Sequence, residues 1–188
     1  MMNDAISSNQ EFDSPEWLDQ INIRHLTFED LPKLEWEGEY THLRQVYLKA
    51  YKSRNEGKSV IWVADLLGKG VIGQVFVQLN ALRKDLADGF SCAYIYSFRI
   101  KSEFRNFGLG KQMLVVVEND LRKRRFREVT LNVAKTNINA IRFYKNNGFE
   151  ISGSEPGEWS YRDHNDKLQK IVEPAWKMIK NIWVNGLS

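Results

Sequence analysis

The sequence predicts one domain of the α/β (α+β) class, with a mixed sheet and helices packed against it. Its length of 188 residues is typical of a single domain. Runs rich in β-branched residues alternate with segments in which apolar residues recur every three or four positions. The sequence contains no internal repeat and no Pro- or Gly-rich linker. These observations favour one α/β fold over a chain of smaller modules.

The first part of the chain divides into an arm and the start of the domain. Residues 1–20 are polar, acidic and aperiodic, so we predict a poorly ordered arm whose end Trp17 fixes to the body. Residues 21–36 predict a short strand and then a helix, which Thr27 would cap. A second helix is predicted over residues 40–53, because its apolar residues fall on one face.

Strands and helices alternate through the rest of the chain. Residues 59–66 and 71–80 are typical of the two strands of a hairpin, since a short Gly-containing turn separates them. Residues 91–100 predict a central strand. The elements expected after it are a helix from residue 109, a strand over 127–135, a helix from 138 that Gly148 closes, and strands over 149–153 and 173–183.

Composition and charge exclude several classes of protein. The chain has 27 basic and 24 acidic residues, a net charge of +3, which argues against a dedicated nucleic-acid binder. Its one cysteine, Cys92, excludes an internal disulfide and a cysteine-rich metal site. No apolar run reaches the length of a membrane span. The first twenty residues carry acids and no Lys or Arg, the reverse of a secretory signal, so we expect a cytoplasmic protein.

The basic run and the three histidines both have ordinary structural explanations. The basic run 122–125, with Arg127, suggests nucleic acid, but a solvated helix C-terminus is favoured because positive charge complements the negative end of the helix dipole. The three histidines, His25, His42 and His164, show no metal-ligand spacing, so we expect no metal.

The stretch "FRNFGLGKQM" places two glycines where a helix is about to start. A nucleotide-triphosphate loop would need Ser or Thr after Lys111, and a dinucleotide fold would need a third glycine at Met113. The remaining pattern is Arg105-x-x-Gly108-x-Gly110. Gly108 would admit a phosphate close to the backbone, and Gly110 would keep the first helical turn open. Two interpretations stand at this point: a pyrophosphate site or a tight strand-to-helix turn.

A second motif decides between them. The segment "LNVAKTNINAIRFYKNNGF" follows at the distance of the next strand and helix. Together with the Arg-x-x-Gly-x-Gly loop it resembles the GNAT superfamily of N-acetyltransferases. The positions that match the family's pattern are Val133, Asn137, Ala140, Tyr144, Gly148 and Phe149. The resemblance covers about residues 21–180, and we assign the whole of 21–188 to one GNAT-like domain.

The resemblance implies a mostly antiparallel sheet of about seven strands, splayed at its centre and flanked by about four helices. It implies acetyl-CoA as co-substrate, with the pantetheine arm lying along the fourth strand. Asn137 would hydrogen-bond the cofactor chain. Backbone groups of the fourth strand would hold the arm and the loop N–H groups would hold the pyrophosphate; these residues are Phe98, Arg99, Ile100, Arg105, Asn106, Phe107, Gly108, Leu109, Gly110 and Lys111.

The resemblance also assigns a catalytic role to Tyr144. A phenol, with a pKa of about 10, is protonated at neutral pH and can give its proton to the leaving thiolate. The alternative is a half-buried aromatic residue that only packs its helix.

The general base is harder to assign. Some family members carry a carboxylate on the fourth strand, but this chain has Tyr94 and Tyr96 there and no acid between residues 89 and 101. Glu35, Glu37 or Glu39 of "LEWEGEY", or a water held by backbone carbonyls, would then take the proton. We name Glu35, Glu37, Tyr94 and Tyr96 as candidate acceptor-binding residues. A solvated helix end explains the same glutamates equally well.

The sequence therefore predicts an acetyl-CoA-dependent N-acetyltransferase. It would acetylate a primary amine, on a small cationic molecule or a peptide N-terminus, by direct attack in a ternary complex. A monomer or a homodimer is expected, with no nucleic-acid or membrane partner. The alternative is a non-catalytic acetyl-CoA sensor or scaffold, which the missing strand carboxylate favours and the complete Asn-to-Phe pattern opposes.

Overall fold

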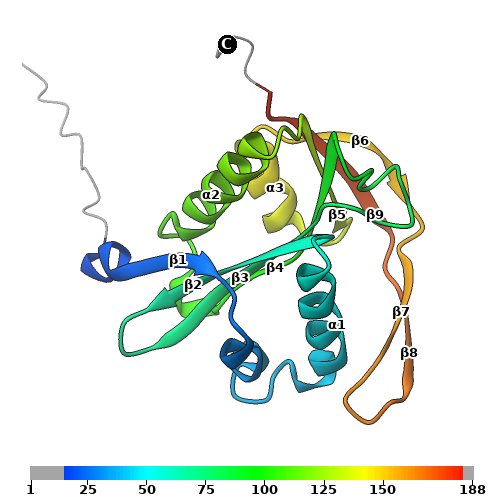
Figure 1. Ribbon diagram of the computed structural model, residues 1–188. Helices are drawn as coiled ribbons and strands as arrows, with labels where there is room; N and C mark the ends of the chain where they lie inside the picture. The colour runs from blue at the N-terminus through cyan, green and yellow to red at the C-terminus, as the bar shows by residue number, and fades with distance from the viewer. Residues whose placement is uncertain (1–14, 184–188) are drawn as a thin grey trace, which may run out of the picture.

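A seven-stranded sheet runs through the computed structural model, which describes residues 15–183 (Figure 1). Its strand order is β1-β2-β3-β4-β5-β9-β6, and every neighbouring pair is antiparallel except β4 and β5. The predicted sheet of about seven mostly antiparallel strands is confirmed. The strands are β1 (Ile21–His25), β2 (Ser59–Leu66), β3 (Gly70–Gln78), β4 (Cys92–Ile100), β5 (Glu128–Ala134), β6 (Glu150–Glu155) and β9 (Ala175–Asn181).

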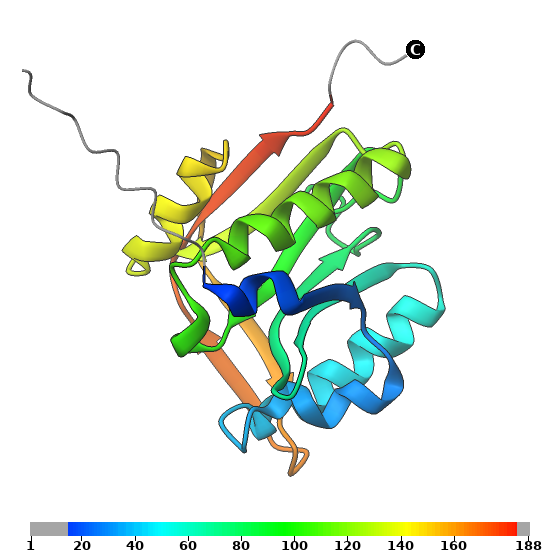
Figure 2. The ribbon, with the colours of Figure 1, turned by 90° about the vertical axis from the view of Figure 1, so that its left-hand side faces the viewer.

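Helices cover both faces of the sheet (Figures 1 and 2). α1 (Arg44–Asn55) packs on one face, and α2 (Leu109–Lys123) and α3 (Ile138–Asn146) pack on the other. Two hydrophobic cores result: Met113 and Val117 of α2 lie in one, and Tyr47 of α1 lies in the other. Short 3₁₀ helices complete the described part of the chain: η1 (Glu16–Gln20), η2 (Phe28–Glu35), η3 (Thr41–Leu43) and η4 (Ser102–Phe104).

The sheet is split between β4 and β5, as the resemblance implied. These strands pair only from Cys92 opposite Glu128 to Ile95 opposite Leu131. Beyond that point the edge of β4 that faces β5 has no strand partner among the described residues. Because buried backbone groups need hydrogen-bond partners, this free edge is suited to an added extended chain.

A β-bulge in β4 lies next to the split. Phe76 of β3 pairs with Tyr96 and Gln74 pairs with Arg99, so two residues of β4, one of them Ser97, stand opposite the single Val75. Ser97 has a φ of 52°, a left-handed conformation that non-glycine residues rarely adopt. The extra residue reverses the alternation of side chains, so Ile95 before the bulge and Phe98 after it face the same core.

The N-terminal segment is described only from residue 15. The predicted arm over residues 1–20 falls mostly on residues 1–14, which lie outside the described residues. Glu16–Gln20 forms η1, and its Leu18 is buried in the core beneath α2. Trp17 stands edge-on to Phe104 and Phe107, with ring centroids 5.1 and 5.6 Å away.

The sequence analysis missed a second, two-stranded sheet. β7 (Glu158–Arg162) and β8 (Leu168–Val172) form an antiparallel hairpin between the two last predicted strands. Polar and charged residues fill most of that stretch, and they hide the alternation of Trp159 and Tyr161. The hairpin runs beside α1 (Figure 1), and Tyr161 lies 6.2 Å from His42 between ring centroids. The hairpin therefore flanks the face of the sheet that α1 covers.

Candidate active site

The loop that joins β4 to α2 has the shape of an anion-binding turn. Asn106 and Gly108 have φ values of 68° and 89°, both left-handed. The first helical hydrogen bond of α2 runs from the N–H of Gln112 to the Gly108 carbonyl oxygen at 3.1 Å. The N–H groups that precede it, up to Lys111, have no acceptor within the helix and carry its positive dipole end. Nε of Arg105 donates to the carbonyl oxygen of Ile100 at 2.7 Å and holds the loop against the end of β4.

The two glycines of this loop have different tasks. Gly108 needs its left-handed φ, and a Cβ added there would meet nothing within 4 Å, so the space beside it is open. At Gly110 an added Cβ would lie 3.2 Å from Cε2 and Cζ of Phe143. The missing side chain of Gly110 therefore lets Phe143 of α3 approach the first turn of α2.

Asn137 caps α3. Its Oδ1 accepts a hydrogen bond from the N–H of Ala140 at 3.1 Å. The cap uses the carbonyl half of the side chain, which leaves the NH₂ group as the half that can donate to a ligand.

Tyr144 lies on α3, only 8% exposed, between two aromatic rings. Its ring centroid is 5.2 Å from that of Phe143 and 5.5 Å from that of Phe149, both edge-on. Burial, with a smaller contribution from the nearby phenol of Tyr94, raises the pKa of Tyr144 above its ordinary value. Its hydroxyl is therefore protonated at neutral pH and can only donate or accept as a neutral group.

The model of the Acetyltransferase (GNAT) family matches residues 25–149, which include the split, the loop and α3. The chain belongs to this family. Members of the GNAT family transfer acetyl groups from acetyl-CoA, so the resemblance found in the sequence is confirmed. No curated protein matches the sequence.

Solved structures with the GNAT fold cover most of the chain. The ribosomal-protein-S18-alanine N-acetyltransferase from Escherichia coli is 18% identical, with a TM-score of 0.65 over 88% of this chain and 96% of that one. A spermidine N-acetyltransferase SpeG chimera from Vibrio cholerae and hSSAT is 18% identical, with a TM-score of 0.63 over 87% and 96%. A GNAT acetyltransferase from Elizabethkingia anophelis with acetyl-CoA bound is 14% identical, with a TM-score of 0.57 over 87% and 99%. Identities this low show a common fold.

Tyr94 and Tyr96 stand where some GNAT proteins carry a strand carboxylate. Their rings are stacked, with centroids 6.0 Å apart and planes 8° apart, and Tyr96 also packs edge-on against Phe76. This is the face of the sheet that α1 covers. Burial raises the pKa of both phenols, so both are neutral at physiological pH and neither supplies a base.

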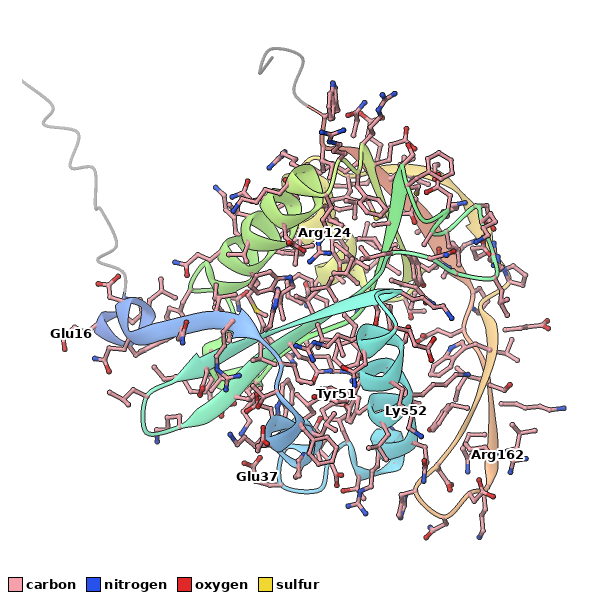
Figure 3. All side chains as sticks on the ribbon, viewed as in Figure 1. Glu16, Glu37, Tyr51, Lys52, Arg124 and Arg162 are labelled. Carbon is pink, nitrogen blue, oxygen red and sulfur yellow. The ribbon has the colours of Figure 1, made fainter. Side chains whose placement is uncertain are left out.

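Of the three candidate glutamates, Glu35 and Glu37 are in ion pairs and Glu39 is exposed. Glu35 accepts from Nε and Nη2 of Arg44, at 2.6 and 2.8 Å, and from Oγ1 of Thr41 at 2.8 Å. The hydrogen bonds from Arg44 are the main cause that lowers its pKa. Glu37 accepts from Nζ of Lys101 at 3.0 and 3.1 Å, and its side chain is 80% exposed at the outer edge of the turn after η2 (Figure 3). Because its pKa is lowered, the Glu35 carboxylate is a weak base.

The side chains that hold the β4 bulge at Ser97 were not predicted from the sequence. Nη1 of Arg99 donates to the hydroxyls of Tyr47 and Ser97, each at 3.1 Å, and its guanidinium lies 4.4 Å from the ring centroid of Tyr40. Nε2 of the fully buried Gln74 donates to Oγ of Ser97 at 3.2 Å. The sequence does contain one sign of these contacts: a glutamine, Gln74, lies inside the apolar run "VIGQVFV" and needs a hydrogen-bond partner when buried.

Two residues of the basic run at the end of α2 are neutralised by acidic partners. Arg122 pairs with Glu118 at 3.1 Å and Arg124 pairs with Asp120 at 2.9 Å. Within residues 15–183, no three His, Cys, Asp or Glu side chains gather where they could hold a metal ion. Over the same residues, no helix is both long enough and apolar enough to cross a bilayer.

Proposed function

We propose that this GNAT protein transfers an acetyl group from acetyl-CoA to a primary amine by direct attack in a ternary complex. The observation that carries the proposal is the split between β4 and β5: β4 leads into the loop before α2, and β5 leads into α3, which carries Tyr144. Acetyl-CoA supplies the activated acyl group, and the chain supplies binding, orientation and a proton.

The described residues fit the cofactor that the family uses. The free edge of β4, over Phe98–Ile100, would pair with the pantetheine amides in the manner of an added strand. The open space beside Gly108 and the N–H groups from Arg105 to Lys111 would receive the pyrophosphate. The NH₂ group of Asn137 would donate to the cofactor chain.

Two chemical tasks fall to groups of this chain. Backbone N–H groups at the β4 bulge are rigidly placed by Gln74 and Arg99 and would polarise the acetyl carbonyl. The neutral phenol of Tyr144 would protonate the leaving sulfur. Because Glu35 and Glu37 are held in ion pairs and Glu39 is exposed, we assign deprotonation of the amine to water at backbone carbonyls.

The acceptor-facing side favours an amine without further positive charges. Glu35 is bound by Arg44, Glu37 by Lys101, and Glu155 of β6 by the guanidinium of Arg83 at 2.8 and 2.9 Å. A polyamine would have to displace these pairs, whereas the neutral wall of Tyr94 and Tyr96 accepts an uncharged amine. Of the two acceptor types expected from the sequence, we therefore propose the peptide N-terminus.

The test is a comparison of amines by release of free CoA from acetyl-CoA. Short unblocked peptides and spermidine would be compared with the same peptides carrying a blocked N-terminus. We expect release with unblocked peptides and little with spermidine. Binding of acetyl-CoA without amine-dependent release would instead support a sensor or scaffold, which the lack of a free base beside Tyr94 favours.

A further inference from the structure

Arg99 places a positive charge on the face of the sheet that α1 covers. It follows the bulge in β4 and lies within Phe98–Ile100, the stretch whose free edge would pair with the cofactor. Its side chain contacts Tyr47 of α1 and the ring of Tyr40, so it points away from the core beneath α2, against which Phe98 packs. The guanidinium therefore stands on the acceptor side of the proposed acetyl-CoA site.

The chain satisfies only part of this guanidinium. Nη1 donates to the hydroxyl oxygens of Tyr47 and Ser97, each at 3.1 Å. Within the described residues, Nε and Nη2 have no hydrogen-bond acceptor, and no carboxylate forms an ion pair with Arg99. Both atoms are open to solvent, unlike the buried and unpaired indole nitrogens of Trp36 and Trp62. Three N–H groups of a half-buried arginine are therefore free to bind a ligand.

The free N–H groups of Arg99 have the geometry of a carboxylate site. Nε and Nη2 lie along one edge of the planar guanidinium and form the fork that binds both oxygens of a carboxylate. The guanidinium carbon lies over the ring of Tyr40, 4.4 Å from its centroid, and Tyr47 and Ser97 hold the opposite edge of the group. A cation–π contact restrains the plane of the group without using an N–H. The arginine is thus held in one orientation with its fork open.

The glutamates of the turn after η2 do not fill this fork. Glu35 is bound by Arg44 at 2.6 Å and Glu37 by Lys101 at 3.0 Å, while Glu39 makes no ion pair within the described residues. An arginine that is largely withdrawn from water normally has an anionic partner. A carboxylate of the ligand is the group that would complete this site.

We propose that Arg99 binds a carboxylate of the acceptor that lies close to the reacting amine. This inference rests on the proposed acetyl transfer and names the chemical class of the acceptor. Arg99 is two residues from Ser97, at the bulge where the acetyl carbonyl would be polarised, so the carboxylate and the amine belong to one small unit. Two sources supply this chemistry: the side chain of an N-terminal Asp or Glu of a peptide, and the main-chain carboxylate of a free amino acid.

The test measures kcat/KM for matched pairs of amines that differ in one carboxylate. Peptides that begin with Asp or Glu are compared with the same peptides beginning with Asn or Gln, and free alanine is compared with alaninamide. In at least one pair we expect the wild type to prefer the acid by about 10- to 100-fold, because hydrogen bonds between charged groups are the strong ones. A preference confined to the peptides assigns the side chain as the source of the carboxylate, and one confined to alanine assigns the main chain.

Arg99→Met keeps most of the apolar stem and removes the fork. The acidic and the neutral member of each pair should then become equal substrates to within about 2-fold. This ratio separates recognition from the contacts of Arg99 with the bulge, because a disturbed bulge would slow both members alike. Arg54→Met is the matched control, since the guanidinium of Arg54 also lies over a tyrosine ring, that of Tyr51 at 5.4 Å, and its loss should leave the preference intact.

Arg99→Lys serves as a second variant if the methionine variant does not fold. Lysine keeps the charge without the fork, so the preference for the acid should fall several-fold. Equal kcat/KM for the acidic and neutral amines in the wild type would overturn the inference. A preference that survives in Arg99→Met, or that is lost equally in Arg54→Met, would also overturn it. Binding of acetyl-CoA with no acetylation of any of these amines would overturn the proposed acetyl transfer, and the inference with it.

Discussion

Tyr144 shows how an environment fixes the role of one side chain. Aromatic neighbours exclude water from its ring, and burial keeps the hydroxyl protonated well above the pH at which a free phenol ionises. A group in that state can donate a proton to a thiolate but cannot act as a base. Packing and proton donation are therefore two separable properties of the same residue.

Tyr144→Phe separates them, because the ring stays and only the hydroxyl is lost. We expect acetyl-CoA affinity to change little while kcat falls by about 10- to 1,000-fold, in the lower half of that range because a thiolate is a tolerable leaving group. Tyr51→Phe on α1, whose ring packs against Phe28 and Arg54, is the matched control and should leave kcat unchanged. Normal kcat in Tyr144→Phe would return this residue to packing alone.

At the scale of elements, η1 is positioned to brace the loop that would hold the pyrophosphate. Leu18 anchors η1 in the core, and Trp17 contacts Phe104 and Phe107 on either side of Arg105. The N-terminal segment thereby restrains a loop that would otherwise depend on the Arg105–Ile100 hydrogen bond.

Trp17→Ala should therefore weaken acetyl-CoA binding by up to about 10-fold, since edge-on aromatic pairs contribute about 0.5–1.5 kcal/mol each. The effect belongs in KM for acetyl-CoA, with kcat unchanged, because no reacting group is moved. Trp159→Ala, which removes a half-exposed tryptophan on β7, is the control. Equal affinities for wild type and Trp17→Ala would show that the loop needs no brace.

Most helices and strands were predictable because the residue patterns that indicate them lie within each element. The period of apolar residues predicts α2 and α3, and β-branched runs predict β2 and β3 as a hairpin. The β7–β8 hairpin was missed because both strands are only five residues long and largely exposed, so they bury no apolar face that the sequence could reveal. The bulge at Ser97 was missed because the register of β4 against β3 depends on contacts between separate strands.

In the candidate site, too, features that depend on residues near in sequence were predictable and features that depend on distant residues were not. The cap at Asn137 and the turn at Gly108 depend on near neighbours and were predictable. The pairing of Glu35 with Arg44 was not, because it crosses a turn in which Trp36, Glu37 and Gly38 all have positive φ. The position of Arg99 over Tyr40 also depends on how distant segments pack together, which no local pattern encodes.

At the scale of the whole molecule, the split divides the sheet into two parts. The part from β1 to β4 and the part from β5 to β6 are joined in the sheet only along Cys92–Ile95 and Glu128–Leu131. Our central claim is that acetyl-CoA occupies the split, pairing with β4 and resting on the N-terminus of α2. A ligand there would connect both parts and would bind only the folded chain.

Thermal unfolding with and without acetyl-CoA tests this claim most directly. At about 100 times its dissociation constant, acetyl-CoA should stabilise the fold by about 2.7 kcal/mol, which corresponds to a rise of about 5 to 10 °C for a chain of this length. Gly108→Val, measured against its own unfolding temperature without ligand, should lose the rise, because its side chain would fill the open space beside the loop. No rise in the wild type, or a full rise in Gly108→Val, would contradict the site described above.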